Sequence, residues 1–152
     1  MADDPPIHPY EKLTTPEGEQ VDIDRELVSV VRGLWRLGFA TTTCCQDVGE
    51  ATAGVRAQRA TPLGYDGDGF IAYHLGYALL KMPVFDAGRL VEMLVRNEVF
   101  SERIRCPWSP GSWRMNIPLT PEGPAIEAFL HFPRAQIAVL ADVLREEACA
   151  LT

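Results

Sequence analysis

The stretch Leu80-Lys-Met-Pro83 has a counterpart later in the chain, Leu130-His-Phe-Pro133, and the two together indicate the fold. Each stretch ends a segment in which apolar and polar residues alternate, the pattern of a strand with one buried face. Pro83 ends the first strand, and Pro133 suits the first turn of a helix. Asp86 can cap a helix after the first stretch, and apolar residues recur at helical spacing after both. With the elements described next, each half of the chain is predicted to contain one helix followed by two strands, and a last helix follows the second half.

The same patterns locate the other elements. A helix begins near Asp24, where Asp22 or Asp24 can cap it, and Gly38 suits its end. The predicted helices cover 24–37, 86–100 and 133–148, and the predicted strands cover 39–45, 77–82 (or from Phe70), 112–118 and 125–132. This order, α-β-β-α-β-β-α, predicts an α+β two-layer sandwich of about four mainly antiparallel strands with three helices on one face. Such an arrangement is ferredoxin-like in a circularly permuted order.

Length and composition indicate one domain. The chain has 152 residues, of which 47% are hydrophobic and 23% charged, so it can form a packed core. Residues 1–20 are rich in proline and lack periodicity, which predicts an extended N-terminal arm before a single domain over 21–152. Within that domain, 46–75 forms a long glycine-rich insertion with a short helix at 51–59. Connections of this length are usually functional or mobile.

Charge and cysteine content limit the partners. The formal net charge of −7 argues against a phosphate-binding surface and therefore against nucleic acid. No apolar run reaches the roughly 18 residues that a membrane span needs, and the acidic, proline-rich N-terminus is unlike a signal peptide. Four cysteines, two of them adjacent, are typical of reduced thiols. We therefore expect a cytoplasmic protein with no membrane partner.

Alternation along the strands predicts an open sheet face, which we define as the side of the sheet without helices. Polar residues gather there: Tyr77, Lys81, Arg114, Asn116, Glu127 and His131. Cys44 and Cys45 are neighbours in a strand, so their side chains diverge and only one of them joins this face. If segment 46–75 and the Trp108 loop fold over this face, they form a ligand pocket. Alternatively, the face is solvated or pairs with a second subunit.

Three residues are the candidates for catalysis: Cys45, Asp47 and His131. Cys45 is a nucleophilic thiol or a polar lining residue, and a nucleophile needs a base or cation such as His74, His131 or Arg114. Asp47 is the acid/base candidate. The alternatives are a core thiol and a solvated loop carboxylate. The predicted ligand-binding residues are Thr43, His74, Tyr77, Trp108, Arg114 as anion clamp, Asn116 and Glu127.

The cysteine and histidine spacings predict no metal site. A zinc site would combine Cys44 or Cys45 with Cys106 and a histidine, but the chain has no paired C-x-x-C spacing. His8 in the arm and His131 in a strand have no obvious partner. The sequence also indicates no particular cofactor.

One part of the chain resembles a known family. Val21-Asp-Ile-Asp24, the helix after it and Phe39-Ala-Thr-Thr-Thr-Cys-Cys-Gln-Asp47 resemble the opening of the wybutosine-type tRNA methyltransferase family. There, a helix leads into a strand that ends in T-T-S-S-C-S-G-R. Thr41 and Thr42 match the two threonines, and Cys45 matches the cysteine. The resemblance, shared with short bacterial proteins, implies functional residues in the turn after Cys45. The family acts on tRNA with S-adenosylmethionine.

These observations predict a small cytoplasmic enzyme or small-molecule-binding domain, with its pocket on the open sheet face under segment 46–75. The reaction and the substrate are not indicated. One alternative is a non-catalytic interaction protein that uses the open sheet face to form a homodimer. A second alternative, from the resemblance, is a protein related to RNA modification.

Overall fold

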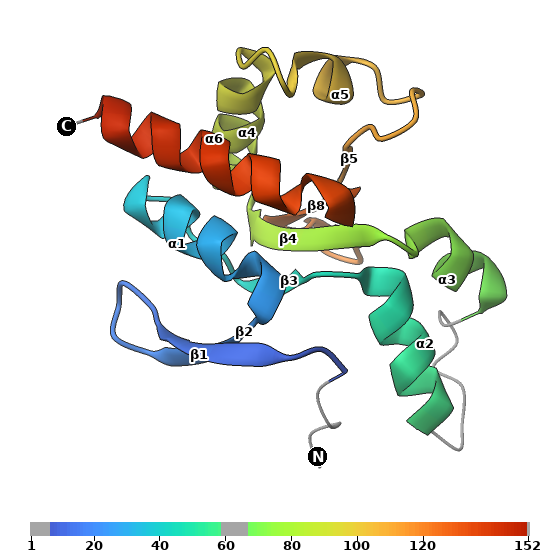
Figure 1. Ribbon diagram of the computed structural model, residues 1–152. Coiled ribbons are helices and arrows are strands. Elements are labelled where there is room, and N and C mark those ends of the chain that lie inside the picture. The colour runs from blue at the N-terminus through green and yellow to red at the C-terminus, as the bar shows by residue number, and fades with distance from the viewer. Residues whose placement is uncertain (1–6, 59–66, 152) are drawn as a thin grey trace.

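The computed structural model describes residues 7–58 and 67–151 and has an α+β architecture (Figure 1). Four antiparallel strands form the main sheet in the order β3-β4-β8-β5, and two further antiparallel pairs are β1-β2 and β6-β7. The strands are β1 (Tyr10–Thr14), β2 (Gln20–Asp24), β3 (Thr43–Cys45), β4 (Tyr77–Pro83), β5 (Arg114–Asn116), β6 (Leu119–Thr120), β7 (Gly123–Pro124) and β8 (Glu127–Pro133). The helices are α1 (Val28–Arg36), α2 (Val48–Gln58), α3 (Asp68–His74), α4 (Val84–Val95), α5 (Ser101–Arg105) and α6 (Ile137–Ala150), with 3-10 turns at Arg25–Leu27 and Arg134–Gln136.

Strands β4 and β8 form the centre of the sheet and repeat one pattern. They pair from Tyr77 opposite Pro133 to Pro83 opposite Glu127, and buried residues alternate with half-buried ones along both. The buried residues are Ala78, Leu80, Met82, Ala128, Leu130 and Phe132. Burying a large apolar side chain contributes about 1.5–3 kcal/mol before conformational entropy is subtracted, so this alternation fixes which face meets the core.

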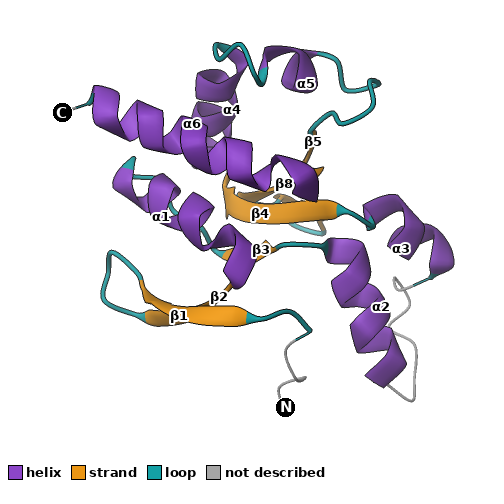
Figure 2. Ribbon diagram, in the orientation of Figure 1, coloured by secondary structure: helices purple, strands orange, loops and turns teal. Residues whose placement is uncertain are grey.

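Helices α1, α4 and α6 cover that buried face (Figure 2). Their apolar sides supply Leu34, Leu90, Leu94, Leu140 and Leu144 to the core. Helices α1 and α6 approach each other closely at Gly33, where an added Cβ would lie only 2.9 Å from the Cβ of Leu144. Within the part of the chain that the structure describes, no helix is both long and apolar enough to span a membrane.

The α+β class is confirmed, but the described residues form six helices and eight strands, more than the three helices and four strands predicted. The predicted helices correspond to α1, α4 and α6, and the predicted strands to β3, β4, β5 and β8. The predicted strands at 112–118 and 125–132 appear as β5 and β8, which pair with each other, and the residues between them form β6 and β7. The predicted helix at 51–59 is the C-terminal part of α2.

The extended arm predicted for residues 1–20 is wrong from Tyr10 onward. Residues 10–14 pair with 20–24, and Leu13 and Ile23 are buried against the core. The prolines lie on either side of strand β1 instead of interrupting it, and Gly18 takes a positive φ of 92° in the turn. Residues 1–6 of the predicted arm and 59–66 of the predicted insertion lie outside the described residues.

Other differences arise from side-chain contacts between elements. Strand β3 begins only at Thr43, because Asp86 Oδ2 accepts the Ala40 amide at 2.8 Å and Trp35 Nε1 donates to Thr41 Oγ1 at 3.2 Å. Asp86 therefore binds the 39–42 segment and makes no side-chain cap on α4. Helix α3 replaces the early strand start suggested at Phe70, and α5 lies between the predicted helix at 86–100 and the predicted strand at 112–118.

Candidate functional site

The open sheet face carries the residues that alternation placed there. The register gives two rows across the sheet, the first of Thr43, Lys81, Phe129 and Asn116, the second of Cys45, Leu79, His131 and Arg114. Cys44 belongs to the opposite face and packs against the hydrophobic core. The prediction that the two adjacent thiols point to opposite faces is therefore confirmed.

Helix α3 packs against one end of this face. The Arg114 guanidinium carbon lies 3.8 Å from the Tyr73 ring centroid and 3.7 Å from that of Tyr77. Arg114 Nη1 also donates to the Tyr73 carbonyl oxygen at 2.7 Å. Two aromatic faces and a carbonyl thus engage the cation that was predicted to clamp an anion.

His131 lies under the same helix. Its ring centroid is 5.0 Å from that of His74. Burial, together with the charges of His74 and Arg114, lowers the pKa of His131 to about 4. His131 is therefore neutral at physiological pH, and proton donation from an imidazolium at this position is disfavoured.

The three catalytic candidates do not share one site. Leu79 of β4 lies between Cys45 and His131 in their row, so these two residues are roughly 10 Å apart, two strand spacings. Asp47 lies beyond the end of β3 and is buried.

The remaining predicted ligand-binding residues are dispersed. Glu127 contacts Thr42 and lies 3.9 Å from Lys81 at the far end of the open sheet face. Asn116 is exposed, and Trp108 is 80% exposed in the loop after α5.

The C-terminal ends of β2 and β3 meet in a polar cluster that we call the β2–β3 junction, formed by His8, Asp24, Cys45, Gln46 and Glu50. Asp24 Oδ2 accepts the Gln46 amide at 2.8 Å, and Gln46 Oε1 accepts the Glu26 amide at 3.2 Å. His8 is 6% exposed, with Nδ1 3.1 Å from Asp24 Oδ2 and Nε2 3.0 Å from Glu50 Oε1. The strand ends are therefore tied together by polar side chains.

Asp47 joins three elements next to the junction. Its carboxylate accepts the Glu50 amide at 2.9 Å, which caps α2, and the Gly76 amide at 3.1 Å. Arg134 Nη1 lies 3.5 Å from Asp47 Oδ2 and also binds Glu50, while its Nε donates to Glu26 at 2.7 Å. These contacts, that with Glu26 first, raise the pKa of Arg134. The buried acid/base candidate is thus fully engaged in structural hydrogen bonds.

Both adjacent thiols are protonated at neutral pH. Burial is the main cause that raises the pKa of Cys44 and of Cys45 to about 12 each, and the Asp24 carboxylate adds to both shifts. A thiolate nucleophile needs a lowered pKa, so these surroundings disfavour nucleophilic catalysis by Cys45.

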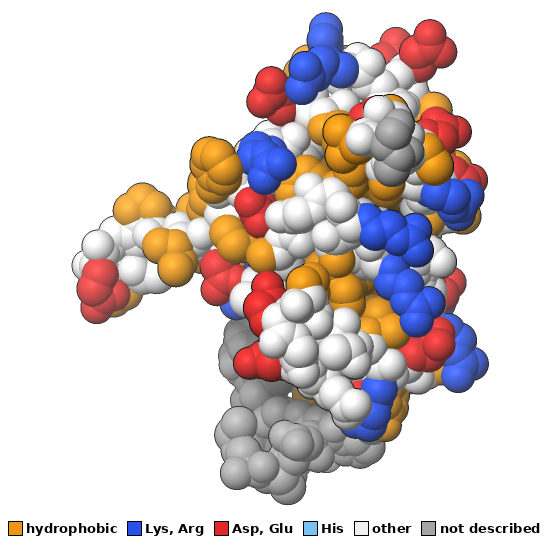
Figure 3. All heavy atoms as spheres, turned by 90° about the vertical axis from the view of Figure 1, so that its left-hand side faces the viewer, with side chains coloured by type: hydrophobic (Ala, Val, Ile, Leu, Met, Phe, Trp, Pro, Cys, Tyr) orange, Lys and Arg blue, Asp and Glu red, His pale blue; other side chains and the backbone are white. Residues whose placement is uncertain are grey.

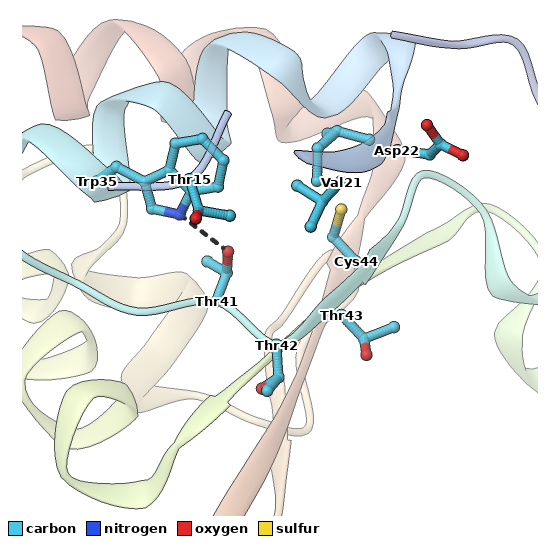
Figure 4. A pocket seen from close by; sticks show the side chains of 9 residues that line it. Thr15, Val21, Asp22, Trp35, Thr41, Thr42, Thr43 and Cys44 are labelled. Carbon is cyan, nitrogen blue, oxygen red and sulfur yellow. Dashed lines mark hydrogen bonds between the residues drawn. The ribbon is translucent and has the colours of Figure 1, made fainter. Parts of the chain in front are cut away.

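Away from the junction, β2 and β3 separate around a wedge-shaped opening that we call the wedge cleft (Figure 4). Val21 and Asp22 of β2 lie on one side and residues 41–44 on the other, and Trp35 of α1 lies at the end near Thr15 and Thr41 (Figure 4). This cavity has a volume of about 280 Å³. A second cavity of about 290 Å³ adjoins it and shares Thr15, Trp35 and Thr41.

The wedge cleft offers hydroxyl groups and one aromatic ring. Thr41 Oγ1 accepts a hydrogen bond from Trp35 Nε1 at 3.2 Å, and Thr15 Oγ1 accepts one from the Glu19 amide at 3.0 Å. A hydroxyl that already accepts has its proton left to donate. The charged lining residues of the two cavities are carboxylates, Glu17 and Asp22.

Sequence reasoning missed both the junction and the cleft. Trp35 lay within the predicted helix at 24–37, the threonines within a predicted strand, and His8 within the predicted arm. Each becomes part of a site only because residues 10–24 form a hairpin that lies beside β3. The buried Leu13 and Ile23, in alternation with polar neighbours, were the signal that could have revealed that hairpin.

No protein-family model matches the chain, and neither the curated proteins nor the solved structures contain a significant match.

Proposed function

We propose that the chain is a small-molecule-binding domain and that the wedge cleft is its ligand site. The observation that carries this proposal is the pair of joined cavities around Trp35, of about 280 and 290 Å³. Each lies close to the lower end of the roughly 300–1,000 Å³ typical of ligand pockets. The open sheet face under 46–75 stays a predicted pocket, with α3 occupying one of its ends.

The lining selects a class of ligand. Trp35 offers a ring face for stacking, and the Thr15 and Thr41 hydroxyls offer protons to acceptor atoms. Glu17 adds negative charge to the lining, whereas Asp22 is paired with Lys12, so the cleft favours a neutral or cationic molecule over an anion. The expected ligand is therefore a neutral or cationic ring compound with carbonyl or ring-nitrogen acceptors.

Matched small-molecule probes test this proposal by nuclear magnetic resonance. The probes are adenosine, nicotinamide and tryptamine, each beside an anionic partner: adenosine monophosphate, nicotinate and indole-3-acetate. We expect neutral or cationic members to shift the Trp35 Nε1–H resonance saturably, and their anionic partners to bind more weakly. The Trp108 resonance is the internal control. If no probe shifts Trp35, or if the anions bind as tightly as their partners, the proposal is wrong.

Substitution of the aromatic ring sharpens the test. Trp35→Ala should weaken binding of the responding probe roughly 5- to 150-fold, since stacking on an aromatic side chain contributes about 1–3 kcal/mol. The amide resonances of Thr41 and Thr43 report binding in this variant. Trp108→Ala is the matched control and should bind with unchanged affinity.

A second candidate function is non-catalytic association with another copy of the chain. It is favoured by Leu119 in β6 and Ile126 shortly after β7, which are 83% and 85% exposed. Light scattering on the wild type and on Leu119→Lys tests it, since a dimer mediated there should dissociate in the variant.

Enzymatic activity and an RNA-related role both stay predictions. On the face that carries the ends of α1 and α6, Lys and Arg side chains gather along one side, with Asp and Glu side chains elsewhere on the same face (Figure 3). Arg32, Arg36 and Arg145 line a small cavity between the two helices. The ferredoxin-like description is likewise a proposal, supported by the element order α1-β3-β4-α4-β5-β8-α6 once the hairpins and short helices are set aside.

A further inference from the structure

We propose that His8, Asp24 and Cys45 bind a divalent metal ion of the zinc class at the β2–β3 junction. One nitrogen, one oxygen and one sulfur atom of these residues all lie within 4.8 Å of one another. The three residues come from the segment before β1, the end of β2 and the end of β3. This site is distinct from the wedge cleft, which takes Cys44 and not Cys45 into its lining.

The spacing fits tetrahedral coordination. Ligand atoms at about 2.0–2.3 Å from a tetrahedral zinc ion lie roughly 3–4 Å from one another. His8 Nδ1 and Asp24 Oδ2 are already 3.1 Å apart. A small inward movement of the Cys45 thiol would complete a three-residue set, and the fourth position would remain for water or another ligand.

The second nitrogen of His8 supplies an independent observation. His8 is buried, and its Nε2 makes no hydrogen bond although Glu50 Oε1 lies 3.0 Å away. Histidines that bind a metal through one ring nitrogen usually direct the other toward a carboxylate, which orients the ring and increases its basicity. Glu50 lies where such a partner is needed.

The local charge also favours a cation. The carboxylates of Asp24, Glu26, Asp47 and Glu50 gather here, and Arg134 is the cation that contacts three of them. The donor set selects the metal, because thiolate and imidazole favour zinc over the hard ions magnesium and calcium. Binding transfers the thiol proton of Cys45 to solvent, so the thiolate replaces a neutral group beside the dication.

Cobalt(II) is the probe that tests the site, because it replaces zinc and absorbs visible light. Co²⁺ added to the metal-free full-length protein should give the absorption of a tetrahedral site and a thiolate-to-cobalt charge-transfer band, and Zn²⁺ should displace it. Cys45→Ser should abolish the charge-transfer band. Cys44→Ser is the matched control, since the neighbouring thiol points to the other face, and it should retain the band.

Further variants measure each contribution. Glu50→Gln should lower Co²⁺ affinity by about 10–100-fold, as expected for a group that orients a ligand, and His8→Gln should lower it further. Circular dichroism establishes that each variant is folded. The proposal is overturned if the wild type gives no charge-transfer band at millimolar Co²⁺, or if the band persists in Cys45→Ser.

Discussion

Strands β2 and β3 are tied together at one end and separated at the other. At the junction, Asp24 and Gln46 connect the two strand ends by hydrogen bonds, and α2, which follows β3, packs against α3 and β4. At the wedge cleft, Trp35 of α1 lines one end of the opening, and threonine hydroxyls retain protons that they can donate. The same pair of strands therefore presents a packed polar region and an accessible cavity.

This difference between the two regions predicts which property of the protein a substitution alters in each of them. At the junction, Asp24 and Gln46 accept backbone amides in a half-buried setting, so removing either side chain leaves an amide unpaired at a cost of about 1–3 kcal/mol. In the wedge cleft, water replaces any lost partner. Substitutions should therefore affect folding stability at the junction and ligand affinity in the cleft.

The largest effect is expected from Gly49→Ala, where α2 meets the turn before β4. A Cβ there would lie 2.5 Å from the Leu75 backbone and 2.6 Å from the Ile71 carbonyl oxygen. Backbone atoms yield little, so the variant should lose about 3 kcal/mol or more of unfolding free energy, measured by urea denaturation. Gly88→Ala in α4 is the control, since nothing lies within 4 Å of its Cβ and alanine favours helix. Equal stabilities of the two variants would contradict the close packing of α2 against α3 and the turn before β4.

A smaller loss is expected from Asp47→Ala. The variant removes the α2 cap and leaves the Gly76 amide unpaired, which should cost about 2–3 kcal/mol. Asp47→Asn retains an acceptor and should lose less. Asp22→Ala in the cleft is the matched control; its exposed pair with Lys12 contributes at most about 0.5–1 kcal/mol. Urea denaturation of the three variants tests whether Asp47 is structural, and an unchanged stability in Asp47→Ala would contradict that role.

The smallest effect concerns pH and His131 beneath α3. Its pKa is about 4 in the folded protein against an ordinary value of 6.5, so the unfolded chain binds a proton first as pH falls. The unfolding free energy therefore has its full value, as far as His131 is concerned, above pH 6.5. It decreases as pH falls toward about 4, because only the unfolded chain takes up the proton over this range. His131→Gln should therefore lose less unfolding free energy between pH 7 and pH 5 than the wild type does. Identical pH dependence in both proteins would show that this histidine is not held neutral.

The sequence was sufficient wherever a repeating pattern met a buried face. Leu80 and Leu130 lie in strands whose alternation predicted the core side of the sheet, and the divergence of Cys44 and Cys45 followed from the same periodicity. Sequence reasoning failed at His8 and Trp35, because the local sequence around these two residues does not indicate which residues they contact. His8 acquires them from β2 and α2, and Trp35 from Thr41 and the hairpin turn.

By itself the sequence determined the α+β class, the three core helices, the order of the main elements and the two faces of the central strands. Local periodicity and burial of apolar surface act over a few residues, so a single chain encodes them directly. Only the tertiary structure decided that residues 10–24 form a hairpin beside β3, and hence where the junction and the wedge cleft lie. Contacts between segments distant in sequence depend on the complete packing of the chain, and no short stretch of residues records them.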